Sequence, residues 1–344
     1  MTQNIPREAL RAWFRSAARD LPWRRARTPY GTWVSEIMLQ QTRVETVVPY
    51  FERFMARFPS VRALAEADPE EVRSLWSGLG YYRRAQLMLR AARILSDRYD
   101  GELPSDPVAL AALPGFGPYT TGAVASLAFD ARVPAVDGNI ERVLARVHGI
   151  EDPRGAAGRR AVWAWSERWV QGERPGEINE GLIELGATVC SLRKPLCLSC
   201  PLRSSCVALK EGKPERIPPP RKRKAPKRVD LAADLFLDGR SVLLVRQPSD
   251  GLFADLWTLP LGPARGGEPL GQVRHLLTHR ELSVEVWRGE GATPDGRWVP
   301  VADLEGWAIP SLVPKLLEVG LPEAMQVDLR WKGRKFARGP ASRR

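Results

Sequence analysis

The chain has 344 residues, of which 44% are hydrophobic and 27% are charged. This is the composition of a globular protein, and the length suits two domains better than one. No apolar run approaches the roughly 20 residues that a membrane helix needs, and the first residues lack the apolar stretch of a signal peptide. Membrane, collagen-like and disulfide-rich classes are therefore excluded.

The formal net charge of +12 is typical of a protein that binds nucleic acid, but the charge is unevenly placed. Residues 210–228 contain nine basic and two acidic side chains, and residues 330–344 contain seven basic and no acidic ones. These two segments account for the whole excess, so composition predicts no basic face on the rest of the chain. A solvated charge run is the alternative interpretation of both.

The first 209 residues are predicted to form a helical domain. Apolar residues recur there at spacings of three and four, and sequences rich in proline and glycine separate the periodic stretches. The predicted helices include residues 43–58, 70–76, 85–99 and 139–150.

The texture of the sequence changes after this domain. Residues 210–228 are rich in proline and charge, which predicts an extended linker. Residues 229–329 carry short β-type runs, the first pair around a turn at Asp238-Gly239, and predict a smaller α+β domain. Residues 330–344 predict a disordered basic tail.

All four cysteines fall in one loop, residues 190–206, with the spacing C-x6-C-x2-C-x5-C. Four thiolates on a short, turn-rich segment are typical of a tetrahedral metal site or an iron–sulfur cluster. Zinc sites more often use two close pairs, and only one pair is that close here. Two disulfides fit poorly with a chain that shows no export signal. The predicted ligands are Cys190, Cys197, Cys200 and Cys206.

Residues 113–119, LPGFGPY, carry a helix–hairpin–helix signature. Gly115 and Gly117 permit a tight turn with backbone amides exposed at the start of the next helix. Such amides bind phosphate oxygens without reading sequence. A simple helix–helix connection is the alternative, because glycine and proline would serve it equally well.

Two acidic residues are predicted to lie in opposite environments. Asp137 precedes a helix, where an ordinary N-cap is the alternative, and the positive end of that helix should keep its carboxylate ionised. Glu36 lies in a strongly apolar helical stretch, so burial should raise its pKa and keep it protonated, unless it faces water. An acid and an anion with separated pKa values suit cleavage of a bond through an oxocarbenium ion.

The chain resembles the endonuclease III superfamily of DNA glycosylases. The resemblance rests on the hairpin, the downstream Asp137 and the four-cysteine loop. Sequences such as WVSEIMLQQTRVETVVPYF at 33–51 and GLGYYRRA at 78–85 are similar to the adenine DNA glycosylase branch. The likeness covers nearly all of residues 6–209 and implies an all-α glycosylase domain with a [4Fe–4S] cluster.

The resemblance also implies roles for individual residues. Adenine opposite 8-oxoguanine or G in double-stranded DNA would be flipped out, with Glu36 protonating it at N7 and Asp137 stabilising the sugar cation. Tyr119 stands where strand-cutting relatives carry a lysine, which implies a monofunctional enzyme. Tyr119 and Asn139 would support the two carboxylates. The adenine pocket would be lined by Trp23, Arg24, Leu39, Glu180 and Ile183.

Further residues are expected at the DNA. Gln41 and Tyr81 match positions that wedge into the duplex, and Arg193 lies in the first cysteine gap, where it could reach phosphates. Core or surface packing is the alternative for the pocket and wedge residues.

The C-terminal domain resembles the Nudix-like module of the same family. Thr278 and His279 match its lesion-reading loop, although Leu277 replaces the usual aromatic residue and the stretch between Pro260 and His275 is short. A metal-binding Nudix box is missing from the sequence, so nucleotide hydrolysis is not expected.

Two other interpretations stay open. One is a related endonuclease III-type glycosylase for thymine or oxidised pyrimidines, against which Tyr119 and the extra domain argue. The other is a non-catalytic iron–sulfur protein that only binds DNA, which would have no need of a buried Glu36 beside an ionised Asp137. In every case we expect a cytoplasmic, nucleoid-associated monomer with no membrane partner.

Overall fold

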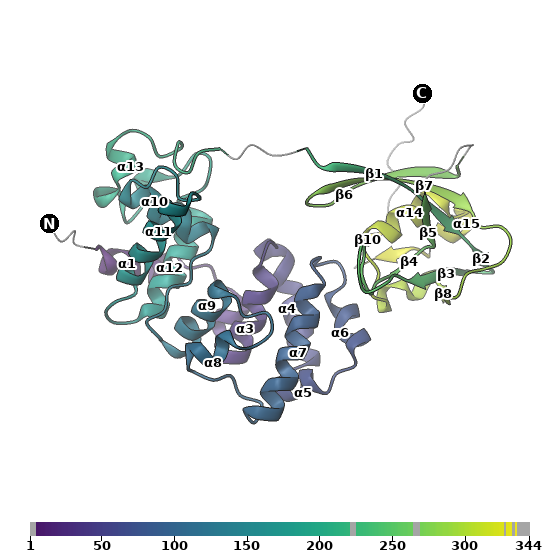
Figure 1. Cartoon of the computed structure of the whole chain (residues 1–344), viewed down its shortest axis with the longest axis horizontal. Coiled ribbons are helices and arrows are strands. Elements are labelled where there is room, and N and C mark those ends of the chain that lie inside the picture. Colours follow the sequence, from purple (N-terminus) through teal and green to yellow (C-terminus); the bar gives the residue numbers. More distant parts are fainter. Residues whose placement is uncertain (1–4, 221–224, 264–268, 327, 332–333, 336–344) are drawn as a thin grey trace. The chain divides into compact units, whose positions relative to one another are not determined.

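The computed structural model describes residues 5–220, 225–263, 269–326, 328–331 and 334–335. The chain divides into two compact units, whose elements are labelled in Figure 1. We call Met1–Glu66 with Gln86–Lys222 the helical unit, and Ala67–Ala85 with Arg223–Arg344 the C-terminal unit. The sequence-based domain boundaries stay predictions. The structure adds to them by grouping a short helical segment, residues 67–85, with the C-terminal unit.

The described part of the helical unit is built of helices alone. Proline occupies the start of five of them, where its fixed φ suits the helix and its missing N–H would have no partner in any case. The α-helices are α1 (Arg7–Ala17), α2 (Pro22–Arg25), α3 (Pro29–Leu39), α4 (Val44–Arg57), α5 (Val61–Ala65), α7 (Arg83–Arg98, which begins in the C-terminal unit), α8 (Pro107–Ala111), α9 (Pro118–Phe129), α10 (Gly138–His148), α11 (Ala156–Trp169), α12 (Pro175–Thr188) and α13 (Val207–Lys210).

Helix α12 is central to this unit. It packs against α1, α9 and α10, while α3 packs against α4 and α9. Leu144 and Leu182 are fully buried in the core between α10 and α12. Apolar burial of this kind contributes about 25 cal/mol per Å², and it holds the N-terminal ends of α9 and α10 in place.

The predicted linker, residues 210–228, begins with a packed segment. Ile217 is 3% exposed, and its carbonyl accepts a hydrogen bond of 2.7 Å from the buried guanidinium of Arg146. Its last two residues already belong to β1 (Lys227–Leu235). Residues 221–224 lie outside the described part of the chain.

Two small sheets form the C-terminal unit. In the first, β1 lies between β5 (Leu261–Pro263) and β7 (Arg280–Arg288), and β7 also pairs with β6 (Gly271–Leu276). Only the β1–β7 pair is parallel. In the second, β3 (Ser241–Arg246) pairs antiparallel with β2 (Leu237–Asp238), β4 (Trp257–Thr258) and β8 (Arg297–Pro300). The predicted turn at Asp238-Gly239 is confirmed, because Asp238 pairs with Ser241 across it.

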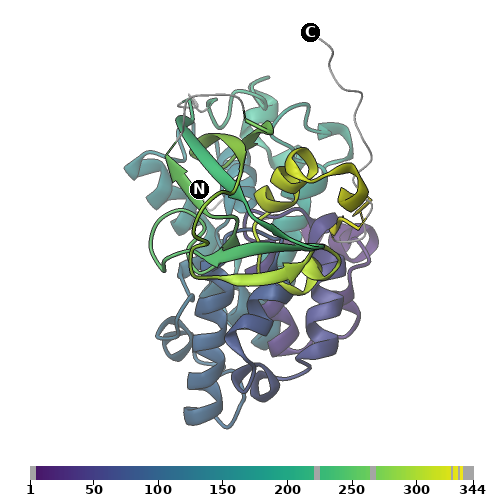
Figure 2. The same cartoon turned by 90° about the vertical axis from the view of Figure 1, so that its right-hand side faces the viewer.

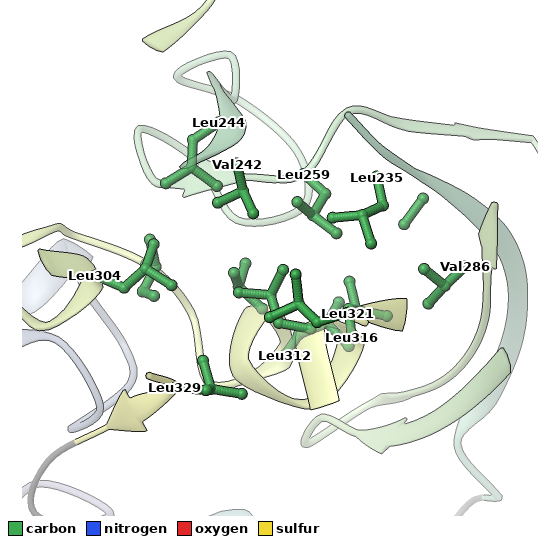
Figure 3. Packing of buried hydrophobic residues seen from close by; sticks show 14 of the residues in the cluster. Leu235, Val242, Leu244, Leu259, Val286, Leu304, Leu312, Leu316, Leu321 and Leu329 are labelled. Carbon is green, nitrogen blue, oxygen red and sulfur yellow. The ribbon is translucent and has the colours of Figure 1, made fainter. Parts of the chain in front are cut away.

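Both sheets and helix α14 (Leu312–Gly320) share one apolar core. Figure 3 shows Leu235, Val242, Leu244 and Val286 from the strands converging on Leu316 of α14. A second view of these green strands and the yellow C-terminal helices is given in Figure 2. The remaining elements are α6 (Pro69–Trp76), the 3-10 helix η3 (Val301–Gly306) and α15 (Glu323–Gln326). The predicted fold class, a helical domain followed by a smaller α+β domain, is confirmed.

The predicted disordered tail needs one correction. Its first part forms two short paired strands, β9 (Arg330–Trp331) and β10 (Arg334–Lys335). Residues 332–333 and 336–344 lie outside the described part of the chain. None of the described helices is both long and apolar enough to cross a membrane.

Candidate active site

A cavity of about 610 Å³ opens in the helical unit, lined by residues of α2, α3, α9, α10 and α12 and by the hairpin before α9. Its volume lies in the range of small-molecule sites. Twelve residues singled out in the sequence line it together: Trp23, Arg24, Glu36, Leu39, Gln41, Gly115, Gly117, Tyr119, Asp137, Asn139, Glu180 and Ile183. Trp23 and Ile183 also pack against core residues, so both interpretations of them hold.

Glu36 lies on α3 and is only 6% exposed. Burial raises its pKa to about 7, and the negative charges of Glu180 and Asp137 add to the rise. The Tyr119 hydroxyl donates a 2.5 Å hydrogen bond to Glu36 Oε2, which opposes the rise by stabilising the carboxylate. The predicted elevated pKa of Glu36 is confirmed, and this side chain can hold a proton near neutral pH.

Asp137 is the N-cap of α10. Its Oδ1 accepts from the backbone amides of Asn139 and Ile140 at 2.9 and 2.8 Å, and its Oδ2 accepts from Asn139 Nδ2 at 2.7 Å. The predicted low pKa is nevertheless wrong in direction. Burial raises the pKa of Asp137, and these three hydrogen bonds offset that rise only in part. The side chain acts as an acceptor in all three contacts, which is the role of a carboxylate.

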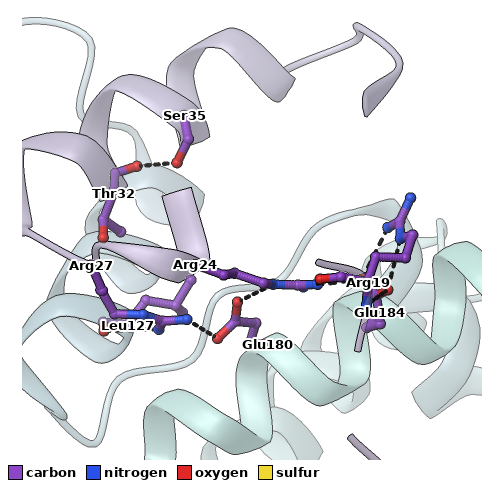
Figure 4. Close-up of polar contacts among 8 residues, drawn as sticks. All are labelled: Arg19, Arg24, Arg27, Thr32, Ser35, Leu127, Glu180 and Glu184. Carbon is purple, nitrogen blue, oxygen red and sulfur yellow. Dashed lines mark hydrogen bonds and ion pairs between the residues drawn. The ribbon is translucent and has the colours of Figure 1, made fainter. Parts of the chain in front are cut away.

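An ion-pair network forms one wall of the cavity, as Figure 4 shows. Arg24 donates to Glu180 at 2.7 Å and to Glu184 at 3.0 Å. Arg19 binds both carboxylate oxygens of Glu184 at 2.7 and 2.9 Å, and Arg27 reaches Glu180 at 2.6 Å. Burial alone would raise the pKa of Glu184, but the hydrogen bonds from Arg19 and Arg24 outweigh it and lower the pKa.

The sequence interpretation missed Arg19, Arg27 and Glu184. One signal was available, because Glu184 lies four residues after Glu180 and therefore on the same face of α12. The basic stretch from Arg19 to Arg27 is the complementary signal. Neither signal says which charges meet, since the partners lie more than 150 residues apart.

Arg142 is a second residue that the sequence did not reveal. Its guanidinium donates to Asn139 Oδ1 at 2.9 Å, to the Gly186 carbonyl at 2.8 Å and to the Cys190 carbonyl at 2.7 Å. This side chain therefore links the N-terminus of α10 to α12 and to the first residue of the cysteine loop.

The predicted hairpin is present between α8 and α9. Gly115 has φ +85°, a conformation that L side chains rarely adopt, and Phe116 stacks on Trp33 at 5.6 Å. Gly117 caps α9 without a side-chain hydrogen bond, which leaves amides of the first turn available beside the cavity. Phosphate binding by these amides stays a prediction.

The four cysteines are free thiols that line one small cavity of about 20 Å³. Val143, Leu185 and Leu202 form apolar parts of its wall. Arg146, which is 1% exposed, donates to Cys190 Sγ at 3.2 Å and to the carbonyls of Ser191 and Leu192. Within the described ranges, no three His, Cys, Asp or Glu side chains are grouped so as to hold a metal ion.

The remaining predicted DNA contacts lie outside the cavity. Tyr81 belongs to the C-terminal unit, and its hydroxyl makes a 2.6 Å hydrogen bond with Thr278 Oγ1. Thr278 and His279 are exposed in the turn between β6 and β7, and Arg193 is exposed in the cysteine loop. The DNA-binding roles of these four residues stay predictions.

The sequence has recognisable relatives. Residues 34–168 match the family of HhH-GPD superfamily base excision DNA repair proteins. The chain is 32% identical to the adenine DNA glycosylase of Homo sapiens over 400 residues, covering 91% of this chain and 73% of that protein. It is 38% identical to the adenine DNA glycosylase of Arabidopsis thaliana over 300 residues, covering 75% and 47%.

Solved structures with a similar fold match the helical part. A thermostable thymine-DNA glycosylase is 28% identical with a TM-score of 0.54, covering 60% of this chain and 95% of that one. A trapped endonuclease III–DNA covalent intermediate is 25% identical with a TM-score of 0.51, covering 60% and 94%.

Proposed function

The chain belongs to the adenine DNA glycosylase family, and we propose that it hydrolyses the N-glycosidic bond of adenine opposite 8-oxoguanine or G in duplex DNA. As in its relatives, the reaction is a step of base excision repair. The observation that carries the proposal is the pairing in one cavity of a protonated Glu36 with an Asp137 held by three hydrogen-bond donors.

The proposed chemistry assigns each carboxyl group one task. Glu36 gives its proton to N7 of the flipped adenine, and the glycosidic electron pair leaves with the base. Asp137 stabilises the positive charge that develops on the sugar. A water molecule then adds to the sugar carbon and gives its proton back to Glu36. Tyr119 has no amine with which to form an imine, which supports a monofunctional enzyme.

The wall network favours a purine base at this site. Arg24 and Glu180 line the cavity and hold each other at 2.7 Å, so they present fixed donors and acceptors to a ligand. Leu39 and Ile183 supply apolar contact area. A few placed polar groups in an apolar lining are what orients a small ligand.

Lesion recognition is proposed for the C-terminal unit. Its Tyr81–Thr278 hydrogen bond joins a residue expected to wedge into the duplex to one expected to read the lesion. Leu277 packs against the core of this unit rather than standing free, which supports a structural part for the residue in the usual aromatic position.

We propose a [4Fe–4S] cluster as the cofactor, held by Cys190, Cys197, Cys200 and Cys206. Four free thiols around one cavity with apolar wall residues fit such a group, and Arg146 supplies a positive charge beside one sulfur. The cluster would hold the loop that carries Arg193 in one conformation. Analysis of the purified protein should find about four iron and four sulfide per chain; one zinc per chain and no iron would contradict this assignment.

The experiment that tests the function is single-turnover base release from a panel of duplexes. It would contain A opposite 8-oxoguanine, A opposite G, T opposite G and an oxidised pyrimidine. We expect release of adenine alone, and we expect Glu36→Gln to slow it by at least about 100-fold because the acid is lost. Release of thymine or of the oxidised pyrimidine instead would establish one of the related glycosylases. Tight binding without any release would establish a DNA-binding protein.

A further inference from the structure

The turn between α6 and α7 has an unusual backbone. Gly78, Gly80 and Tyr81 all have positive φ, of +96°, +71° and +49°. Glycine adopts such angles freely, but a bulky aromatic residue there is uncommon and persists only where its surroundings hold it. The pose of Tyr81 therefore depends on contacts that fasten this turn.

Arg84 supplies most of those contacts. Its guanidinium donates to the carbonyls of Leu79, Gly80 and Tyr81 at 3.3, 3.1 and 3.4 Å. It also lies 5.4 Å from the centre of the Tyr81 ring, within the range of a cation–π contact. One side chain thus holds both the carbonyls of the turn and the ring that the turn presents.

Trp76 completes the arrangement from below. It is fully buried, its Nε1 donates to the Gly80 carbonyl at 3.2 Å, and its ring lies 5.3 Å from the Arg84 guanidinium. Burial lowers the pKa of Arg84 to about 10, so the group still carries its charge at neutral pH. Arg84 is consequently a charged hub between a buried indole and an exposed phenol.

The outward side of the turn is left accessible. Tyr81 is 43% exposed although Arg84 and Trp76 fix its base, and its hydroxyl meets Thr278 Oγ1 at 2.6 Å. A preorganised aromatic ring loses less conformational entropy on inserting between bases than a mobile one.

We propose that Arg84 is a positioning residue that controls discrimination between the bases opposite adenine, and that it acts through Tyr81. The inference rests on the proposed function, because it deepens the part that Tyr81 would play in it. Arg84 itself need not touch DNA. Its effect follows from holding Tyr81 in the left-handed conformation and the ring over the guanidinium.

The test compares single-turnover adenine release opposite 8-oxoguanine with release opposite G. In Arg84→Gln the ratio of the two rates should fall by about tenfold, the size of a lost positioning contact. Arg83→Gln is the matched control, since Arg83 is an exposed neighbour that removes the same charge. It should leave the ratio within about twofold, as expected for a surface substitution. Arg84→Lys keeps the charge but not the fork that spans three carbonyls, and it should resemble Arg84→Gln.

A double-mutant cycle separates this role from a general loss of structure. In a Tyr81→Ala background, Arg84→Gln should change the ratio by less than about twofold, because the residue through which it acts is gone. An unchanged ratio in both Arg84 variants, or full additivity with Tyr81→Ala, would overturn the inference. If Arg84→Gln does not fold, Arg84→Lys enters the cycle instead. Absence of adenine release by the wild-type protein would refute the proposed function, and is thereby told apart from failure of this inference.

Discussion

At the scale of single residues, the two cavity carboxyl groups differ in their hydrogen-bond partners more than in their burial. Glu36 is 6% exposed and has one hydroxyl donor, whereas Asp137 accepts from two backbone amides and a side-chain amide. Each donor stabilises the ionised form, so the carboxyl group with fewer donors is the one that retains a proton near pH 7. Separate protonation states arise in one cavity by this means.

Tyr119→Phe tests this explanation. The Tyr119 hydroxyl lowers the pKa of Glu36 from the value that burial would set, so removing it should raise that pKa above about 7. Activity that needs protonated Glu36 is lost as pH rises through its pKa, and the alkaline limb of the rate profile should therefore move to higher pH. Single-turnover rates between pH 5 and 9 measure the limb. A shift to lower pH would show that Tyr119 does not act on the Glu36 carboxylate.

At the scale of elements, α10 and α12 approach each other too closely for any side chain at one position. A Cβ on Gly186 would lie 2.5 Å from Asn139 Cβ and 3.0 Å from its Cα. The Gly186 carbonyl also accepts from Arg142, which binds Asn139 as well. The position of Asn139, and with it the hydrogen bonds to Asp137, therefore depends on a glycine in the neighbouring helix.

Gly186→Ala should displace the N-terminus of α10. We expect a loss of stability of about 1–3 kcal/mol, as for other overpacked sites, and a rate of adenine release lower by about 100-fold. Thermal unfolding and single-turnover rates measure the two effects. A variant as stable and as fast as the wild type would mean that the helices part without moving Asn139.

At the scale of the whole molecule, the charge of +12 favours DNA without selecting a sequence. Much of the excess is in residues 221–224 and 336–344, outside the described part of the chain. Among described residues, Arg193 is exposed in the cysteine loop, next to Lys194 with its left-handed φ of +51°. Its predicted partner is a phosphate.

Arg193→Ala should weaken binding to every duplex by a similar factor, whatever base lies opposite adenine. It should also reduce the slope of log affinity against log salt concentration by about 1, because one phosphate contact is lost. Fluorescence anisotropy at several salt concentrations measures the slope, with Arg160→Ala, an exposed arginine of α11, as the charge-matched comparison. A loss confined to lesion-containing duplexes would contradict a phosphate contact.

The sequence by itself determined the features that depend on local residue types. Proline and glycine spacing predicted the hairpin at 113–119, apolar periodicity predicted α4, α6, α7 and α10, and a carboxyl group in an apolar helix predicted the raised pKa of Glu36. These follow from short-range geometry and burial, which a single stretch of sequence encodes.

The tertiary structure alone decided what depends on distant partners. It reversed the expected pKa direction of Asp137, because the burial that other helices impose outweighs the field of its own helix. It joined Arg19, Arg24 and Arg27 to α12, and it grouped Tyr81 with Thr278 across 197 residues. Such pairings are chosen by packing of whole elements, since desolvation and ion pairing vary with the three-dimensional surroundings and not with spacing along the chain.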